Sequence, residues 1–193
     1  MMRVRIFFNW AKFIKVQLCE LGMPDLWYGQ GNLIFKVHFP LIKQGIIDSY
    51  IHVFQSSMSV SSKCFLYRHI VDNFSLQYYL CKRIPNIYKK QLAKIRLSSH
   101  QLSIESGRHQ NIARHERLCS ICNSELEDEY HFILICHAYS DLRKKYIKRF
   151  YWNRPSVFKL VQLLSVHNIK VLCNLGKFIK SAFDLRKGLI SQR

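Results

Sequence analysis

The stretch from Cys119 to Cys136 constrains this chain more than any other part of its 193 residues. It contains the pattern C-x2-C-x8-H-x4-C, formed by Cys119, Cys122, His131 and Cys136. A C-x2-C turn presents two thiolates to one point, and a second pair of ligands completes the tetrahedron that Zn²⁺ prefers. Because the ligands are gathered only in the folded chain, a bound metal contributes folding free energy directly. The spacing therefore predicts a structural zinc site with these four side chains as ligands.

The last two ligands pose a geometric problem. His131 and Cys136 are five residues apart, which separates them by roughly 140° around an ideal helix of 3.6 residues per turn. They cannot both face one metal ion from a regular helix. Either His131 lies at or before the start of a helix, or the helix begins near Cys136. His137 is the alternative fourth ligand, ranked below His131.

Other interpretations of these residues are open from the sequence. Cys119 and Cys122 could form a disulfide, Cys136 could be a buried thiol, and His131 could be a core histidine. The chain has no long apolar run and no leader typical of secretion, so we expect an intracellular protein, nuclear or cytoplasmic, that is not secreted and does not enter a membrane. Thiols in such a reducing compartment usually stay free or bind metal, which disfavours the disulfide. The other cysteines are expected in the core: Cys19, Cys64, Cys81 and Cys173.

Hydrophobic periodicity predicts a mainly α fold, a helical bundle-like domain that carries the small zinc-stapled element. The expected helices cover residues 3–21, 41–57, 85–97, 130–149, 158–167 and 169–187. The helix at 85–97 is expected to bury Ile87, Leu92, Ile95 and Leu97, and the last helix Leu172, Leu175, Ile179, Ala182 and Phe183. We expect an N-terminal helical region, 1–80, and a basic helical region, 81–193, which contains the zinc motif at 119–137. No linker marks that boundary, and a single domain is the alternative.

The chain is strongly basic, with a formal net charge of +18, and its charge is uneven. Residues 81–118 carry nine Lys or Arg against two acidic residues, and residues 139–193 carry thirteen against two. Residues 119–138 carry four acidic residues and no Lys or Arg. Basic flanks of this size are typical of proteins that neutralise the phosphates of a polyanion, although any single run could be a solvated helix face. The acidic residues are expected to stay solvated or to pair with the flanks.

The charge pattern predicts nucleic acid, RNA or DNA, as the partner. The candidate binding residues are Lys89, Lys90, Lys94, Arg96, Arg114, Arg117, Arg143, Lys144, Lys145, Lys148 and Arg149. Aromatic side chains at 146 and 150–152 lie among the last of these, and some could stack on bases, although most are expected in the core. No catalytic residue is predicted, because a zinc ion with four protein ligands has no open position for water.

Two segments carry a resemblance to a known family: LAKIRLSSHQLSIESGRH and RHERLCSICNSELEDEYHFILICHAYSDLRKKY. Residues 92–154, which contain both, resemble the region after the reverse transcriptase domain in LINE-type (non-LTR) retrotransposon polyproteins. The C-C-H-C motif of that family maps onto Cys119, Cys122, His131 and Cys136. The resemblance implies a region that helps grip template RNA or target DNA, with a polymerase domain as a partner.

The chain departs from that family in what it lacks. The sequence contains no catalytic aspartate pair of the Y/F-x-D-D kind, no palm-like segment and no endonuclease. We therefore expect a C-terminal piece that binds nucleic acid and is not itself an enzyme. The alternative is a structural or protein-interaction domain in which zinc only supports folding.

Overall fold

The computed structural model describes residues 10–29, 31, 34–71, 73 and 75–192. The chain divides into two compact units, Met1–Ser57 and Met58–Arg193, which are described separately below. The boundary predicted after residue 80 falls inside the second unit. Residues 3–9 of the first predicted helix lie outside the described residues.

The described residues of the first unit are mostly helical. Helix α1 spans Trp10–Glu20, α2 spans Pro24–Tyr28, and α3 spans Phe35–Val60, whose last turn belongs to the second unit. Gly22 follows α1 with a φ of +71°, a left-handed conformation that glycine adopts without steric cost. Helix α3 begins well before the predicted residue 41 and contains Pro40 within its second turn.

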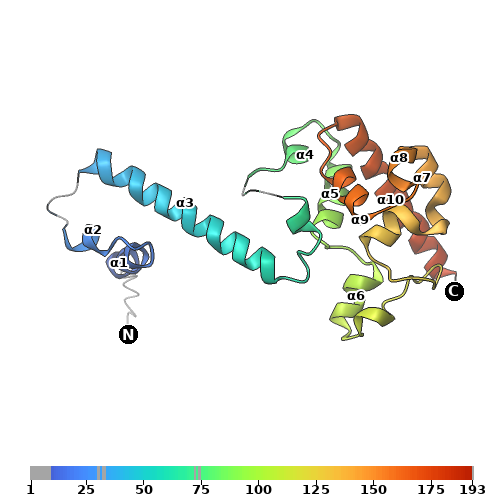
Figure 1. The fold of residues 1–193 in the computed structure, drawn as a ribbon, viewed down its shortest axis with the longest axis horizontal. Coiled ribbons are helices and arrows are strands. Elements are labelled where there is room, and N and C mark those ends of the chain that lie inside the picture. The colour runs from blue at the N-terminus through green and yellow to red at the C-terminus, as the bar shows by residue number, and fades with distance from the viewer. Residues whose placement is uncertain (1–9, 30, 32–33, 72, 74, 193) are drawn as a thin grey trace, which may run out of the picture. The chain divides into compact units, whose positions relative to one another are not determined.

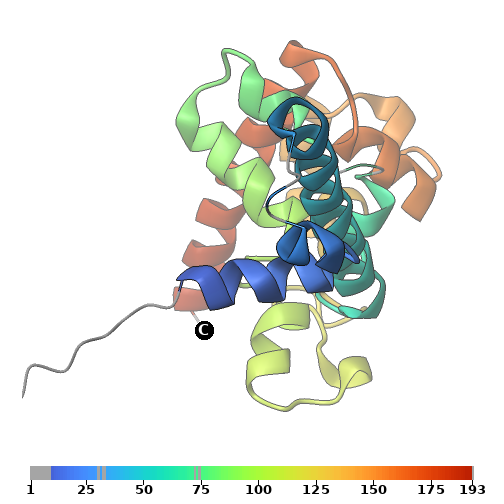
Figure 2. The same cartoon turned by 90° about the vertical axis from the view of Figure 1, so that its left-hand side faces the viewer.

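The second unit is built around its last helix. Helix α10, Ile169–Ser191, packs against α5, Asn86–Arg96, which lies beside it in Figures 1 and 2, and against the short helix α7, Ser140–Tyr146. A second short helix, α8, Arg149–Trp152, follows α7. The stripe predicted for α10 is confirmed at four positions, which are buried: Leu172, Leu175, Ile179 and Ala182. Leu92 and Ile95 of α5 are buried as predicted, but Ile87 and Leu97 are 48% and 44% exposed.

The remaining helices of the second unit are short. They are η2, Tyr67–His69; α4, Tyr78–Cys81; α6, Ser103–His109; η3, Arg114–Glu116; η4, His131–Ile135; η5, His137–Tyr139; and α9, Val157–Leu164. The helix predicted at 130–149 is instead three pieces, because the backbone becomes extended at Cys136, with ψ of 122°, and again at Ile147, with ψ of 130°. Side-chain caps fix the starts of the last two helices: Ser156 Oγ accepts from Lys159 N, and Asn168 Oδ1 from Val171 N.

The predicted mainly α fold is confirmed. All elements named in the described residues are helical, and the β pairing there is a single bridge between Leu118 and Leu126. None of the described helices combines the length and the apolar character needed to cross a bilayer.

The crossing of α5 and α10 depends on a glycine. A Cβ on Gly176 would lie 2.5 Å from the Cβ of Tyr88, closer than two such atoms can approach. The substitution Gly176→Ala is therefore expected to destabilise the second unit by about 1–3 kcal/mol, measured by chemical denaturation. Gly188 is the control on the same helix, because nothing lies within 4 Å of its added Cβ. Gly188→Ala should stabilise by roughly 0.5–1 kcal/mol, and equal effects of the two substitutions would contradict the close crossing.

Candidate metal centre

The first two ligands lie in a tight hairpin. Cys119 N donates to Glu125 O at 2.8 Å, and Glu127 N donates to Arg117 O at 3.0 Å, which pairs the two arms on either side of the Leu118–Leu126 bridge. The hairpin turns at Asn123, whose N–H donates to Cys119 O at 2.8 Å and whose φ is +54°. Asparagine tolerates this left-handed conformation better than most residues. The turn therefore brings the thiols at 119 and 122 to the same side of the hairpin.

The other two ligands lie at the two ends of a π-helical turn. Element η4 begins at His131, and Cys136 N donates to His131 O at 2.8 Å, a hydrogen bond between residues five apart. This wider turn answers the geometric problem of the H-x4-C spacing, because residues five apart return to the same side of a π-helix. Asp128 Oδ1 accepts from His131 N at 2.8 Å and caps the start of the turn. His131 therefore does lie at a helix start, one of the two solutions expected from the sequence.

These elements bring the four predicted ligands together. One ligand atom from each of Cys119, Cys122, His131 and Cys136 lies within 4.8 Å of the others, a Cys₃His group that could hold a metal ion. His137, the alternative ligand, is exposed and outside this group. All seven cysteines are free thiols, so no disulfide joins Cys119 to Cys122.

The spacing of the donor atoms matches one tetrahedral ion. Two sulfurs on one zinc, each at about 2.3 Å, lie about 3.8 Å apart, and a sulfur and an imidazole nitrogen about 3.6 Å apart. The sulfurs of Cys119 and Cys136 are 4.0 Å apart, and Cys122 Sγ lies 3.3 Å from His131 Nε2. Three ligands are buried and Cys122 is partly exposed, as expected for a closed site beneath the surface.

The protonation equilibria of the ligands are strongly perturbed by one another. The hydrogen bond to Cys136, followed by burial, raises the pKa of Cys119 to about 12, and the same contact lowers the pKa of Cys136. Burial lowers the pKa of His131, but hydrogen bonds to Cys119 and Glu125 outweigh it and raise that pKa to about 9. Deprotonating both thiols together therefore needs a compensating positive charge. A metal ion supplies one and keeps coordinated thiols deprotonated.

Glu125 orients the histidine ligand. Its carboxylate Oε2 lies 3.2 Å from His131 Nδ1, while the opposite ring nitrogen, Nε2, faces the sulfur of Cys122. A metal-bound histidine commonly donates its other ring N–H to a carboxylate, which fixes the tautomer and the direction of the ring. The contact therefore leaves Nε2 as the ring nitrogen that could bind a metal ion.

Glu127 joins the hairpin to two helices. Its side chain is fully buried and accepts hydrogen bonds from Ser103 N at 2.8 Å, Ser103 Oγ at 2.6 Å, and Arg186 Nε and Nη2 at 2.9 and 2.7 Å. Its Oε1 also lies 3.7 Å from Cys119 Sγ. Burial would raise the pKa of Glu127, but the bonds from Arg186 and Ser103 lower it, so the carboxylate stays ionised. Glu127 thereby connects the hairpin to α6 through Ser103 and to α10 through Arg186.

Glu129 has a similar structural role. It is buried and accepts from Ser98 Oγ at 2.5 Å and His100 Nε2 at 2.9 Å. These bonds outweigh the opposing effect of burial and lower its pKa. The acidic stretch is therefore not a solvated loop, since Glu125 contacts a ligand, Asp128 caps the π-turn, and Glu127 and Glu129 are buried hydrogen-bond acceptors. These roles were not predicted from the sequence. The alternation of 125, 127 and 129, with Asp128 three residues before His131, is the signal that could have indicated them.

Three predicted nucleic-acid contacts are engaged inside the protein. Arg143 is buried and donates from Nε to Ile133 O and from Nη2 to Cys136 O, both at 2.8 Å. Arg117 donates to Ile112 O and Ile104 O. Arg96 is buried over the ring of Tyr79 and donates to Gln77. Arg143 and Arg117 thus bind backbone carbonyls, whereas Arg96 binds a side-chain oxygen in a buried position, so none of the three guanidinium groups points into solvent toward a partner.

The other predicted basic residues are mostly on the surface. The exposed ones are Lys90, Lys94, Arg114, Lys144, Lys145, Lys148 and Arg149, while Lys89 is partly buried and donates to Leu80 O at 2.8 Å. Among the aromatic residues nearby, Tyr151 is buried as expected, but Phe150 is 57% exposed.

Comparison of the chain with protein-family models, with curated proteins and with solved structures found no match.

Proposed function

We propose that the Cys₃His group binds one Zn²⁺ as a structural ion, and that the second unit binds RNA or DNA through its exposed cations. Thiolate and imidazole ligands in a tetrahedral arrangement are the set that zinc prefers. Four protein ligands close the coordination sphere and leave no position for a reacting water. On this proposal the chain binds its partner and catalyses no reaction.

The observation that carries the nucleic-acid proposal is a run of exposed cations around the α7–α8 junction. This basic segment consists of Lys144, Lys145, Lys148 and Arg149, all exposed, and it is followed by the exposed ring of Phe150. One of its cations has an acidic neighbour, Asp141, which lies 3.5 Å from Lys144 Nζ in an exposed pair of little energetic weight. Exposed cations beside an exposed aromatic ring suit phosphates together with a stacked base.

The family resemblance belongs to the same proposal. The four gathered ligands are the positions that match the C-C-H-C motif of LINE-type polyproteins, and the basic segment lies within the resembling region, residues 92–154. The chain would then correspond to the region after the reverse transcriptase domain, with a polymerase domain as a partner.

A structural or protein-interaction domain is the second candidate function. The observation that favours it is the internal use of Arg96, Arg117 and Arg143, together with Glu127 and Glu129, in holding the fold. In that case the zinc would only support folding, and the net charge would serve solubility. The two functions differ in whether the purified protein has salt-dependent affinity for nucleic acid.

Fluorescence anisotropy with labelled RNA and DNA oligonucleotides across a salt series tests the proposal. Wild type should bind at low salt, with an affinity that falls linearly on a double logarithmic plot. The triple substitution Lys144→Gln, Lys145→Gln and Lys148→Gln should weaken binding about tenfold or more and reduce the slope for single strands by about 2. The matched control is the triple substitution Lys36→Gln, Lys43→Gln and Lys170→Gln, which removes the same charge from three other exposed lysines. Absence of any affinity at low salt would refute the proposal and leave the second candidate.

A further inference from the structure

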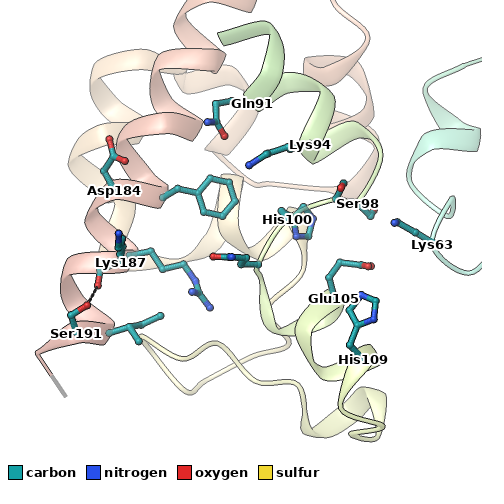
Figure 3. A pocket seen from close by; sticks show the side chains of 15 residues that line it. Lys63, Gln91, Lys94, Ser98, His100, Glu105, His109, Asp184, Lys187 and Ser191 are labelled. Atoms are coloured by element: carbon teal, nitrogen blue, oxygen red, sulfur yellow. Dashed lines mark hydrogen bonds between the residues drawn. The ribbon is translucent and has the colours of Figure 1, made fainter. Parts of the chain in front are cut away.

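A groove of about 700 Å³ opens on the second unit, away from the metal ligands themselves. It is lined by residues of α5, α6 and α10 and of the turn after α3. Figure 3 shows that its lysines come from three separate elements: Lys63 from the turn after α3, Lys94 from α5 and Lys187 from α10. We call it the lysine groove. Of these three lysines, only Lys94 was predicted from the sequence as a nucleic-acid contact, because only the fold brings the three together.

The acidic residues of the groove do not neutralise its lysines. Glu105 pairs with Arg108 at 2.9 Å, and Asp184 pairs with Lys180 at 2.7 Å, so both lining carboxylates have partners outside the lining. Among the ion pairs formed by the described residues, none includes Lys63, Lys94 or Lys187. The groove therefore has three ammonium groups without a carboxylate partner, which favours an anionic occupant.

The same groove offers apolar surface between its cations. Phe183 and Ile190 of α10 line it, and Phe183 is held in place because its ring stacks on that of Phe132 at 4.7 Å between centroids. A positively charged groove with an aromatic surface is the arrangement by which proteins hold single strands, with phosphates on the cations and bases against the rings. A volume of about 700 Å³ lies in the range of small-ligand sites, so it suits a few nucleotides and not a duplex.

We propose that the lysine groove binds a single strand of nucleic acid, with phosphates against Lys63, Lys94 and Lys187 and bases against Phe183 and Ile190. This inference rests on the proposed function and adds a site for the strand. The basic segment of α7–α8 does not line the groove. The two surfaces can therefore be removed independently, with the single strand contacting the groove and a duplex contacting only the basic segment.

The test compares three triple variants of the full chain, loaded with zinc. The groove variant is Lys63→Gln, Lys94→Gln and Lys187→Gln, and the reference variants are the α7–α8 triple and the control triple at Lys36, Lys43 and Lys170. Each is titrated against a labelled 12-nucleotide single strand, the matching duplex, and polyglutamate as a polyanion without bases. The groove variant should lose about tenfold or more in affinity for the single strand, with a salt slope smaller by about 2, and keep its affinity for the duplex. Unchanged circular dichroism establishes that each variant is folded.

The outcomes separate this inference from the proposed function. If wild type binds the single strand and the groove variant matches the control triple, the groove site is refuted while nucleic-acid binding stands. If wild type binds none of the oligonucleotides, the proposed function fails and the groove site fails with it. If the affinities of the groove variant for polyglutamate and for the single strand fall by equal factors, the groove is a general anion site and the proposed strand geometry is wrong.

Discussion

Replacing Cys136 with serine should abolish stoichiometric metal binding and remove much of the stability of the second unit. The Cys136 thiol is buried at the end of the π-turn, and Phe132 within that turn is fully buried against Phe183 of α10. Structural zinc contributes apparent free energies of about 10–16 kcal/mol in small zinc-folded peptides. Even half of the lower value corresponds to a fall in melting temperature of about 10–20 °C for a domain of this size.

Elemental analysis and thermal unfolding measure the two effects. Wild type should contain about one zinc per chain, and excess chelator should lower its melting temperature toward that of Cys136→Ser. The matched control is Cys173→Ser on α10, because this thiol is partly buried and outside the ligand group. It should keep its zinc and melt within a few degrees of wild type.

A pair of histidine variants identifies the fourth ligand. His131→Ala should lose the metal. His137→Ala should retain it, because His137 is exposed and lies outside the Cys₃His group. Protein that is free of metal yet as stable as the zinc-loaded form would refute the structural role of the ion. Loss of metal from His137→Ala alone would refute the assignment of His131.

Breaking the pair between Glu127 and Arg186 should have the second-largest effect. Glu127→Gln keeps the shape of the side chain but leaves a guanidinium that is only 11% exposed without its charge partner. Removing one partner of a buried ion pair typically costs about 3–5 kcal/mol, because the other charge remains desolvated. Arg186→Met should cost a similar amount, and the double variant less than the sum of the two, by about 1 kcal/mol or more.

The control for this prediction lies on the same helix. Lys180 and Asp184 form a pair of equal length, 2.7 Å, but their side chains are 40% and 65% exposed. Asp184→Asn should therefore leave the free energy of unfolding almost unchanged, because water screens an exposed pair. Urea denaturation of all the variants measures the difference, and similar losses for Glu127→Gln and Asp184→Asn would contradict a buried structural pair.

The Cys₃His group could be predicted from the sequence because it depends on local spacing and on the chemistry of thiols and imidazoles. The turn that positions Cys136 could not. The letters between His131 and Cys136 are FILI, an apolar run without periodicity, and three of these four side chains are buried in the tertiary structure. Packing around that run, which no local pattern encodes, selects a bond between residues five apart over the usual four.

The long helices likewise could be predicted from the sequence only in part. The stripe of α10 was predictable because it is buried along most of the helix, whereas α5 leaves Ile87 and Leu97 exposed although its apolar residues recur at helical spacing. The exposure of the basic residues was harder still to predict from the sequence. Arg143 and Lys144 are neighbours in the sequence, yet one is buried against backbone carbonyls and the other is exposed. Charge in a sequence predicts a partner for the whole chain but does not show which side chains are already engaged.

Glu127 touches two places at once, since one oxygen lies 3.7 Å from the Cys119 sulfur while both oxygens accept from Arg186, which lines the lysine groove. If a metal ion and a strand bind as proposed, any coupling free energy transmitted through this contact is reciprocal. A bound strand would change the affinity for the metal by some factor, and a bound metal would change the affinity for the strand by the same factor. Oxidation or chelation of the thiols would then act on the groove without touching any residue that lines it.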